Sequence, residues 1–388
     1  MLFGLRCYRR IDALQYERRS AESSNDKQKT QCKGSLDCYT SYEEEVINFN
    51  SFEKVSVITP SYNCRSTLLS VIESVREQGT VVLEHIIVDD GSNDGTYELI
   101  DELRESRNYK HIKVVRQVNS GEASAVNHGF ELSRGEFVLI VNADDPLLRD
   151  CIYKLLSVLS CSPDVVVAYP DWKMIGEDGE TLRKIYTLDF KIQSLIGDLV
   201  CVVGPAGLIR RSAVKGKFLR DQKYTYLGDY EMWMRLSLQG GFTRVPEILA
   251  TWRKTNGNAT SRGRGKDISQ EYFRLNRDFF NRSDLLPEVK KLERRALAHT
   301  YYYAGIQKLF CPELAGRRQV IRSWIMWPVA FSKNRSIKRS KLISIAVIFY
   351  PVPLLIARIL YFFNVPLPEI AKDALLSQKA DIVSLKHN

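Results

Sequence analysis

"HIIVDDGSNDGTYELID", residues 85–101, joins an apolar run to a polar loop and then to a helix-forming segment. Counted from Asp90, the oxygen-bearing side chains fall close to the spacing of the calcium loop of an EF-hand. An EF-hand loop follows a helix, however, whereas Ile86, Ile87 and Val88 form a β-branched run that predicts a buried strand. The loop therefore opens at the carboxyl end of a strand, where α/β proteins collect ligands.

Units of the same kind recur on both sides of this loop. Apolar runs of strand length lie at residues 55–59, 85–90, 111–117, 136–145 and 164–172, with helix-like segments at 66–78, 96–106 and 122–133. Strands that alternate with helices over this length predict an α/β fold, with a mostly parallel, doubly wound sheet flanked by helices. Beyond Asp267, apolar residues recur at helical spacing, which predicts a helical C-terminal extension.

These patterns divide the chain into four segments. Residues 1–50 are polar and mixed in charge, so we expect an N-terminal extension that is poorly ordered or loosely helical. Residues 51–265 hold the α/β domain, and residues 266–335 hold the helical region. Residues 336–388 form a tail with basic and apolar stretches.

The composition of the chain limits the classes of partner and the cellular compartment, but it does not identify a single partner. A net charge of +10 favours anionic partners, which include nucleotides, nucleic acid and acidic lipid. The eight cysteines contain no CxxC pair, which indicates reduced thiols in a cytoplasmic protein. The apolar stretch at the start of the chain is too short for a signal peptide.

A basic stretch that begins within the helical region, and the apolar run that follows it, suggest a membrane surface. Residues 317–341 contain eight Lys or Arg and no acid, and an apolar run follows at 342–363. Pro351, Pro353 and Arg358 argue against a single membrane span, although a span and a buried pair of core helices both stay open. We favour a basic segment on anionic headgroups and an apolar segment that dips into the interface, with the protein peripheral at the inner membrane face.

Two acidic pairs, Asp89–Asp90 and Asp144–Asp145, end two of the expected strands. A single pair is common in turns, but two pairs at neighbouring strand ends are better explained by a ligand site. One carboxylate there can accept hydrogen bonds from a base or a ribose. Another can hold Mg²⁺ or Mn²⁺ against a diphosphate, because both ions prefer oxygen ligands.

Four ordered motifs carry a resemblance to a known family. They are "VSVITPSYNCRSTLLSVIESVREQ", "IIVDDGSNDGT", "NSGEASAVNHGFELSRGEFVLIVNADD" and "GDYEMWMRL". In this order and spacing the chain resembles the family 2 glycosyltransferases with the GT-A fold, over roughly residues 53–255. Any one of these motifs alone would be weak evidence.

The resemblance implies a role for each matching residue. Pro60 and Tyr62 would flank the nucleotide base, Asp90 would accept a hydrogen bond from the base, and Asp89 would shape the turn. Asn119, Gly121 and Asn127 match a segment near the ribose and phosphates. Asp144 would contact the ribose and, with Asp145, the metal ion, Mg²⁺ or Mn²⁺. Asp229, in "GDYEMW", matches the catalytic base.

The chain departs from the family pattern at two positions. Asn142 stands where many members have an acid, so metal binding here rests on fewer carboxylates. Many members also have a histidine shortly after the base, whereas "TWRKTNGNAT" offers Arg253 and Lys254. We expect Arg253 to neutralise the leaving diphosphate in place of part of the metal's charge.

These expectations lead to an inverting, metal-dependent glycosyltransferase. It would move a single sugar from a nucleotide-diphosphate sugar, with UDP slightly favoured, to a saccharide or lipid-linked acceptor in cell-surface polysaccharide or glycan synthesis. "QVIRSW", at residues 319–324, has one residue too many for the QxxRW of processive synthases, which favours single transfers. The alternative is a catalytically silent module that binds nucleotide sugars or acts as a scaffold. Nucleic acid is not expected as a partner, because the basic "SRGRGK" contains no aromatic residue.

Overall fold

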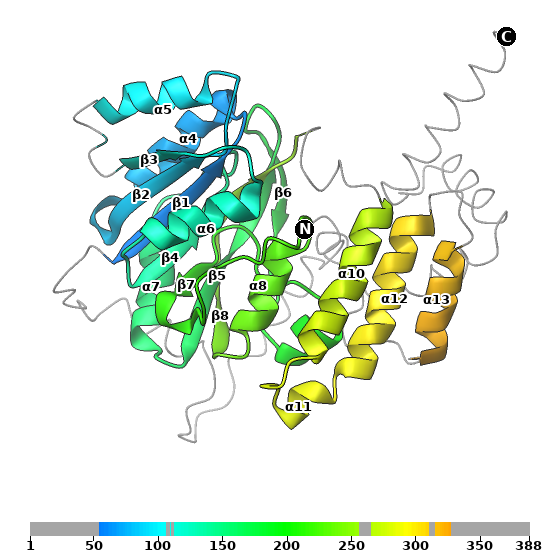
Figure 1. The fold of residues 1–388 in the computed structure, drawn as a ribbon. Helices are drawn as coiled ribbons and strands as arrows, with labels where there is room; N and C mark the ends of the chain where they lie inside the picture. Colours follow the sequence, from blue (N-terminus) through cyan, green and yellow to red (C-terminus); the bar gives the residue numbers. More distant parts are fainter. Residues whose placement is uncertain (1–53, 106–108, 110–111, 256–264, 310–314, 327–388) are drawn as a thin grey trace, which may run out of the picture. The chain divides into compact units, whose positions relative to one another are not determined.

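The computed structural model describes residues 54–105, 109, 112–255, 265–309 and 315–326 (Figure 1). The chain divides into two compact units. Unit 1 holds the described residues as far as Lys191 and those from Cys201 to 255, and unit 2 holds 192–200 and the described residues from 265 onward. The predictions for residues 1–50 and 336–388 lie outside the described residues.

Unit 1 is built on one eight-stranded sheet with the order β3-β2-β1-β4-β7-β5-β6, and β8 pairs with β5. The strands are β1 (Val55–Ser61), β2 (Val82–Asp89), β3 (Ile112–Arg116), β4 (Phe137–Ile140), β5 (Val165–Ile175), β6 (Thr181–Ile185), β7 (Leu208–Arg210) and β8 (Gly241–Arg253). The helices are α4 (Arg65–Arg76), α5 (Thr96–Glu105), α6 (Glu122–Leu132), α7 (Cys151–Cys161) and α8 (Gly228–Leu236), with short turns at Gly79–Val81 and Arg211–Ala213.

Most strand pairs of this sheet are parallel. β1 pairs in parallel with β2 and β4, β2 with β3, and β5 with β8. β7 is antiparallel to both β4 and β5, and β6 is antiparallel to β5. The predicted mostly parallel α/β sheet flanked by helices is therefore confirmed.

Alternate side chains of β2 point to opposite faces of the sheet, and helices cover both (Figure 1). Ile87 packs with residues of α4 and α5, whereas Ile86 and Val88 pack with Ala125 of α6. In α6, a Cβ on Gly129 would lie 2.5 Å from a side-chain carbon of Ile58, so only glycine permits this close approach. Burial on both faces explains why the parallel strands read as apolar runs.

Unit 2 is helical, as the spacing of apolar residues predicts. It contains α10 (Gly265–Phe280), α11 (Pro287–Lys290), α12 (Glu293–Leu309), α13 (Ala315–Met326) and the turn Gln193–Gly197. Asp198 lies after that turn and forms a bidentate ion pair with Arg295 of α12. Two guanidinium nitrogens of Arg295 each lie 2.7 Å from one carboxylate oxygen of Asp198. Within the described residues, no helix has both the length and the apolar character needed to cross a membrane.

Candidate active site

The carboxyl ends of the parallel strands meet at one edge of the sheet. Ser61, the last residue of β1, is in register with Asp89, the last residue of β2. Because β7 is antiparallel to both β4 and β5, β5 and its partner β8 run in the same direction as β4. The end of β8, Arg253, is paired with Ile175 at the end of β5. The strand-end edge therefore carries the loops after β1, β2, β4, β5 and β8.

Asp89 holds the turn that follows β2. Its side chain is fully buried, and its Oδ2 lies 3.2 Å from Nε of Arg116 on β3. It also accepts the backbone N–H of Ser92 at 3.3–3.4 Å, while the Arg116 guanidinium donates to the Ser92 carbonyl at 2.9 Å. These contacts close the turn, so the carboxylate of Asp89 is engaged in contacts with other groups of the protein.

Asp90 holds the segment that leads into α6. Its Oδ1 accepts hydrogen bonds from Gln117 Nε2 and from the backbone N–H of Ser120, and its Oδ2 accepts the N–H of Gly121, each at 2.8 Å. The side chain is only 4% exposed. A carboxylate has about four lone-pair sites, so this geometry leaves about one for a ligand.

The other residues expected near a nucleotide differ in exposure. Pro60 is buried within β1 in register with Val88, whereas Tyr62 follows the strand and is 50% exposed. Asn119 and Gly121 are exposed before α6, and the φ of +87° at Gly121 favours glycine. Asn127 lies in the second turn of α6, with its side-chain amide bonded to the backbone of residues 219–220.

The segment after β4, residues 142–146, is the acidic loop. Asn142 donates from Nδ2 to Oδ2 of Asp145 at 3.0 Å, and the backbone N–H of Arg253 donates to Oδ1 at 2.7 Å. Burial, followed by the charge of Asp144, holds the pKa of Asp145 well above its usual range. Burial also raises the pKa of Asp144, which is partly exposed.

Arg253 reaches across the acidic loop from the end of β8. Its Nε donates to the carbonyl of Asp144 at 3.0 Å, and one terminal nitrogen donates to the carbonyls of Gly176 and Glu177 at 3.0 and 2.8 Å. Arg253 is 7% exposed. At least three of its five N–H groups therefore donate hydrogen bonds to backbone carbonyls. The positive charge of Arg253 still lowers the pKa values of Asp144 and Asp145.

Helix α4 and the residue Gln78 hold the acidic loop and the residues that follow it, which the sequence does not predict. Thr67 donates to the carbonyl of Ala143 at 2.9 Å, and Ser74 accepts the N–H of Leu147 at 3.0 Å. Gln78, just beyond α4, donates to the carbonyl of Leu148 at 3.1 Å and accepts the N–H of Ile152 at 3.0 Å. The only signal in the sequence is that Ser74 and Gln78, one helical turn apart, are polar residues beside the apolar face of this segment.

Asp229 lies in the first turn of α8. Its Oδ1 accepts the backbone N–H of Tyr230 at 2.7 Å, and the side chain is partly exposed. Burial, followed by the charge of Asp229, raises the pKa of the Cys201 thiol to about 12. Asp229 is therefore close enough to Cys201 for an electrostatic interaction, and Cys201 begins the segment 201–207 that leads into β7.

The acidic loop has the chemistry that a divalent cation needs. Mg²⁺ and Mn²⁺ bind through one or two carboxylates and complete their shells with phosphate oxygens and water. Asp144 and Asp145 supply two such groups. Among the described residues, no three His, Cys, Asp and Glu side chains are grouped to hold a metal ion, so the remaining ligands would have to come from elsewhere.

Comparison with known proteins identifies the domain. Residues 56–217 match the family model described as glycosyl transferase family 2. Residues 56–217 form a family 2 glycosyltransferase domain. This glycosyltransferase domain is 36% identical over 140 residues to the uncharacterized glycosyltransferase YibD of Escherichia coli, covering 36% of this chain and 40% of YibD. It is 29% identical over 230 residues to the putative teichuronic acid biosynthesis glycosyltransferase TuaG of Bacillus subtilis, covering 56% of this chain and 86% of TuaG.

Solved structures show the same fold as this glycosyltransferase. Residues 1–349 of S. aureus TarS superpose with a TM-score of 0.53 at 17% identity, covering 71% of this chain and 81% of that one. The complex of TarS with UDP-GlcNAc gives a TM-score of 0.54 at 19% identity, covering 70% and 79%. The GT-A fold of the glycosyltransferase domain is therefore established.

Proposed function

We propose that this chain is an inverting glycosyltransferase that moves one sugar from a nucleotide-diphosphate sugar to a hydroxyl of a saccharide or lipid-linked acceptor. The observation that carries the proposal is the pair Asp144 and Asp145, held by Arg253 at the strand-end edge of a family 2 glycosyltransferase domain. TarS has been solved with UDP-GlcNAc and with UDP, and TuaG is named for teichuronic acid biosynthesis. This likeness supports a UDP-sugar donor and a product in cell-surface polysaccharide or glycan synthesis.

Donor binding is assigned to the loops after β1, β2 and β3. Tyr62 offers an exposed aromatic face for the base, and Asp90 has about one lone-pair site left for a ring N–H. Asn119 and Gly121 are exposed before α6, where backbone N–H groups favour phosphate.

Asp144 and Asp145 are assigned to Mg²⁺ or Mn²⁺. When bound, the ion would supply positive charge that neutralises the departing diphosphate. Asn142 fixes the orientation of Asp145 through its amide, and Arg253 adds a second, permanent cation to the acidic loop. Because the guanidinium of Arg253 is engaged with three carbonyls, we assign it to support of the loop as well as to charge neutralisation.

Asp229 is assigned as the general base. Its carboxylate would remove the proton from the acceptor hydroxyl as that oxygen attacks the anomeric carbon. The bond from the anomeric carbon to the diphosphate oxygen breaks on the opposite side, which inverts the configuration. General base assistance of this kind contributes about 10²–10⁴-fold in rate.

Nucleotide release from a panel of nucleotide sugars, with Mn²⁺ and candidate acceptors, tests the function. We expect one donor to be turned over and Asp229→Ala to lose about 10²–10⁴-fold of that rate, with UDP affinity unchanged. Asp164→Asn, at an exposed acid directly before β5 and so at the opposite edge of the sheet, is the matched control and should leave the rate unaltered. Binding of neither UDP nor GDP, together with no turnover, would reject the enzyme in favour of a silent module.

We place the reaction at the inner membrane face on the basic stretch 317–341 and the apolar run 342–363. Most of this region lies outside the described residues. Sedimentation of the full-length protein with phosphatidylglycerol vesicles, but not with phosphatidylcholine vesicles, is the expected result. If the protein sedimented with neither kind of vesicle, the membrane would be removed from the proposal.

A further inference from the structure

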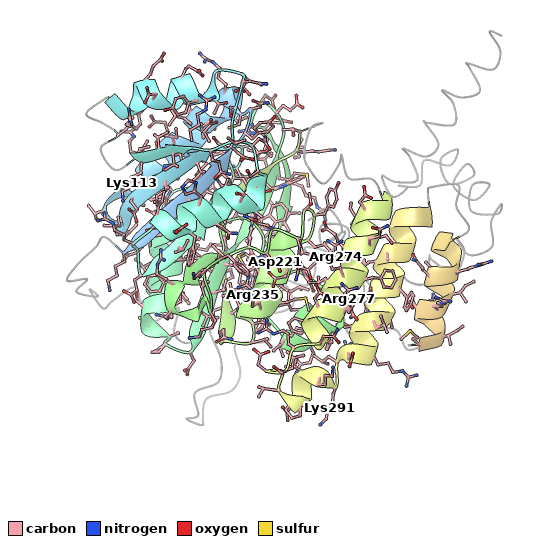
Figure 2. All side chains as sticks on the ribbon, viewed as in Figure 1. Lys113, Asp221, Arg235, Arg274, Arg277 and Lys291 are labelled. Carbon is pink, nitrogen blue, oxygen red and sulfur yellow. The ribbon has the colours of Figure 1, made fainter. Side chains whose placement is uncertain are left out.

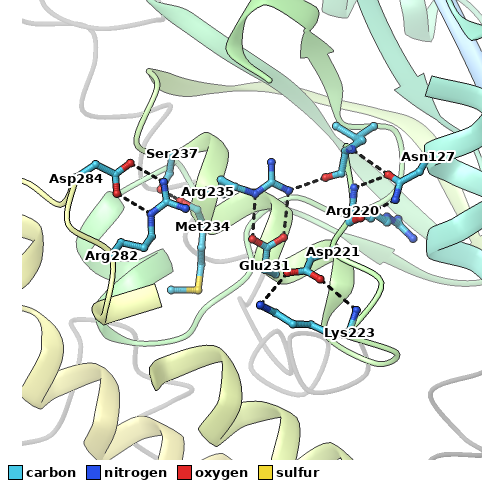
Figure 3. A network of polar contacts seen from close by, with 11 residues as sticks. Asn127, Arg220, Asp221, Lys223, Glu231, Met234, Arg235, Ser237, Arg282 and Asp284 are labelled. Atoms are coloured by element: carbon cyan, nitrogen blue, oxygen red, sulfur yellow. Dashed lines mark hydrogen bonds and ion pairs between the residues drawn. The ribbon is translucent and has the colours of Figure 1, made fainter. Parts of the chain in front are cut away.

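A short backbone segment of unit 1, residues Leu219–Asp221, is bonded to two helices at once, and we call it the strap. From α6, Oδ1 of Asn127 accepts the N–H groups of Leu219 and Arg220 at 2.9 and 2.8 Å, and its Nδ2 donates to the carbonyl of Arg220 at 2.7 Å. These three contacts bind the Asn127 amide to the strap, as Figure 3 shows.

The strap is bound by α8 on its other side. Arg235 donates to the carbonyl of Leu219 at 2.7 Å, and Glu231 holds the Arg235 guanidinium with two contacts of 3.0 and 3.1 Å. Figure 2 shows Asp221, at the end of the strap, close to Arg235, and Figure 3 enlarges the network. A second link to α6 is the ion pair between the Arg220 side chain and Glu122.

The two bridged helices belong to different parts of the proposed reaction. Helix α6 begins directly after Gly121, whose N–H is held by Asp90 in the donor region. Helix α8 carries Asp229 in its first turn and Arg235 nearly two turns later. The strap therefore ties the donor side of the site to the helix that carries the base.

Asn127 has little capacity left for a donor. Both lone pairs of its Oδ1 are occupied by the strap, and one of its two Nδ2 hydrogens is used. We propose that Asn127 is a positioning residue, which acts through Leu219 and Arg220 to set the distance between Asp229 and the bound donor. This inference rests on the proposed function, and it replaces a direct contact between Asn127 and ribose or phosphate.

The surroundings of Asn127 allow it to be changed without leaving an apolar void. It lines an open groove of about 450 Å³ whose lining residues, apart from Phe218, are polar and include Gln117, Ser124, His128 and Lys217. Water can enter such a groove and satisfy the N–H groups that Asn127→Ala would release. We therefore expect that variant to fold, with its melting temperature as a check.

The decisive experiment separates turnover from donor binding. Asn127→Ala should lower kcat at saturating donor by roughly 10²-fold, because small displacements of a catalytic group have effects of this size. Its Kd for UDP should stay within about twofold of wild type, as expected when only transition-state positioning is lost. Asn127→Asp keeps an oxygen for the two strap N–H groups and should recover part of kcat. Arg235→Lys, on the α8 side, should repeat the kcat loss.

Glu131→Ala is the matched control, because Glu131 is exposed on α6 and lines the same groove without bonding the strap. Its kcat and Kd should equal those of wild type. A UDP Kd weakened about tenfold or more in Asn127→Ala, with kcat retained, would overturn the inference, since it would indicate contact with the nucleotide.

Hydrogen exchange distinguishes a failed inference from a failed function. The amides of Leu219 and Arg220 should exchange faster in Asn127→Ala than in Glu131→Ala, whether or not the protein turns over a sugar. Unchanged exchange would overturn the strap itself. Faster exchange in a protein that binds no nucleotide would leave the strap standing and reject the proposed function.

Discussion

Replacing Arg253 by alanine removes the guanidinium that crosses the acidic loop. Its side chain is 7% exposed and donates to the carbonyls of Asp144, Gly176 and Glu177. The Gly176 contact is buried, so its carbonyl would be left without a donor at a cost of about 1–3 kcal/mol. The other two contacts are partly buried, and water can replace them at about 0.5–1.5 kcal/mol each.

These contributions put the expected loss for Arg253→Ala at about 2–6 kcal/mol, with a midpoint of about 4 kcal/mol, in the free energy of unfolding of unit 1. For a domain of this size that corresponds to a melting temperature roughly 10 °C lower. Urea unfolding followed by tryptophan fluorescence suits the measurement, because Trp172, Trp233 and Trp252 are buried in unit 1. Arg253→Lys should lose less, since a lysine keeps the charge but not the planar set of donors.

Arg149→Ala is the control for Arg253→Ala, because Arg149 follows the acidic loop and its side chain is 91% exposed. A change within about 0.5 kcal/mol is expected there. If Arg253→Ala lost less than about 1 kcal/mol, the role of the guanidinium as the support of the loop would be refuted. Weaker binding of UDP, with unaltered stability and unaltered binding of UMP, would instead assign Arg253 to the diphosphate.

Three further outcomes follow from the buried titratable groups and the acidic loop. Because burial raises the pKa values of Asp144 and Asp145, Mn²⁺ affinity in the presence of UDP should rise with pH, by up to about tenfold per unit, in calorimetric titrations at a series of pH values. Removal of the ion with EDTA should lower turnover, and Asp145→Asn should reduce the pH dependence of binding, because only Asp144 is then left to titrate; full turnover in EDTA would contradict the metal assignment. Burial lowers the pKa of His85 to about 3, so the folded state binds fewer protons there than the unfolded chain below pH 6.5. Stability should therefore fall as pH decreases from about 6.5 towards 3, by up to about 1.4 kcal/mol per unit, and His85→Gln should flatten that slope in urea unfolding at matched pH.

Local patterns in the sequence determined much of unit 1. The run Ile86–Val88 and its neighbours predicted buried parallel strands, because burial on both faces demands consecutive apolar residues. The sequence around Asp229 also indicates a helix, because Trp233 and Leu236 recur at helical spacing in α8. Aspartates at strand ends indicated a ligand site because parallel strands bring their carboxyl ends to one edge.

Other parts of the fold carry no such local signal. β8 contains Pro246 and pairs with β5 through register shifts near Pro170 and Asp171, so its alternation is interrupted. The short β7 has only three residues, and its antiparallel pairing with β4 and β5 depends on the path of the chain between them. Because the sequence does not predict β8, it could not show that Arg253, at the end of this strand, binds the acidic loop.

Apolar periodicity and motif order are properties of neighbouring residues, so they were enough to predict the fold class, the family and the acidic residues. What those residues touch depends on how the folded chain brings distant segments together. Arg253 binds a carbonyl 109 positions away, and Asn127 binds backbone 92 and 93 positions away. Hydrogen bonds of such long range are made only after the sheet has assembled, so no spacing along the chain encodes whether a polar side chain faces a ligand or holds another loop.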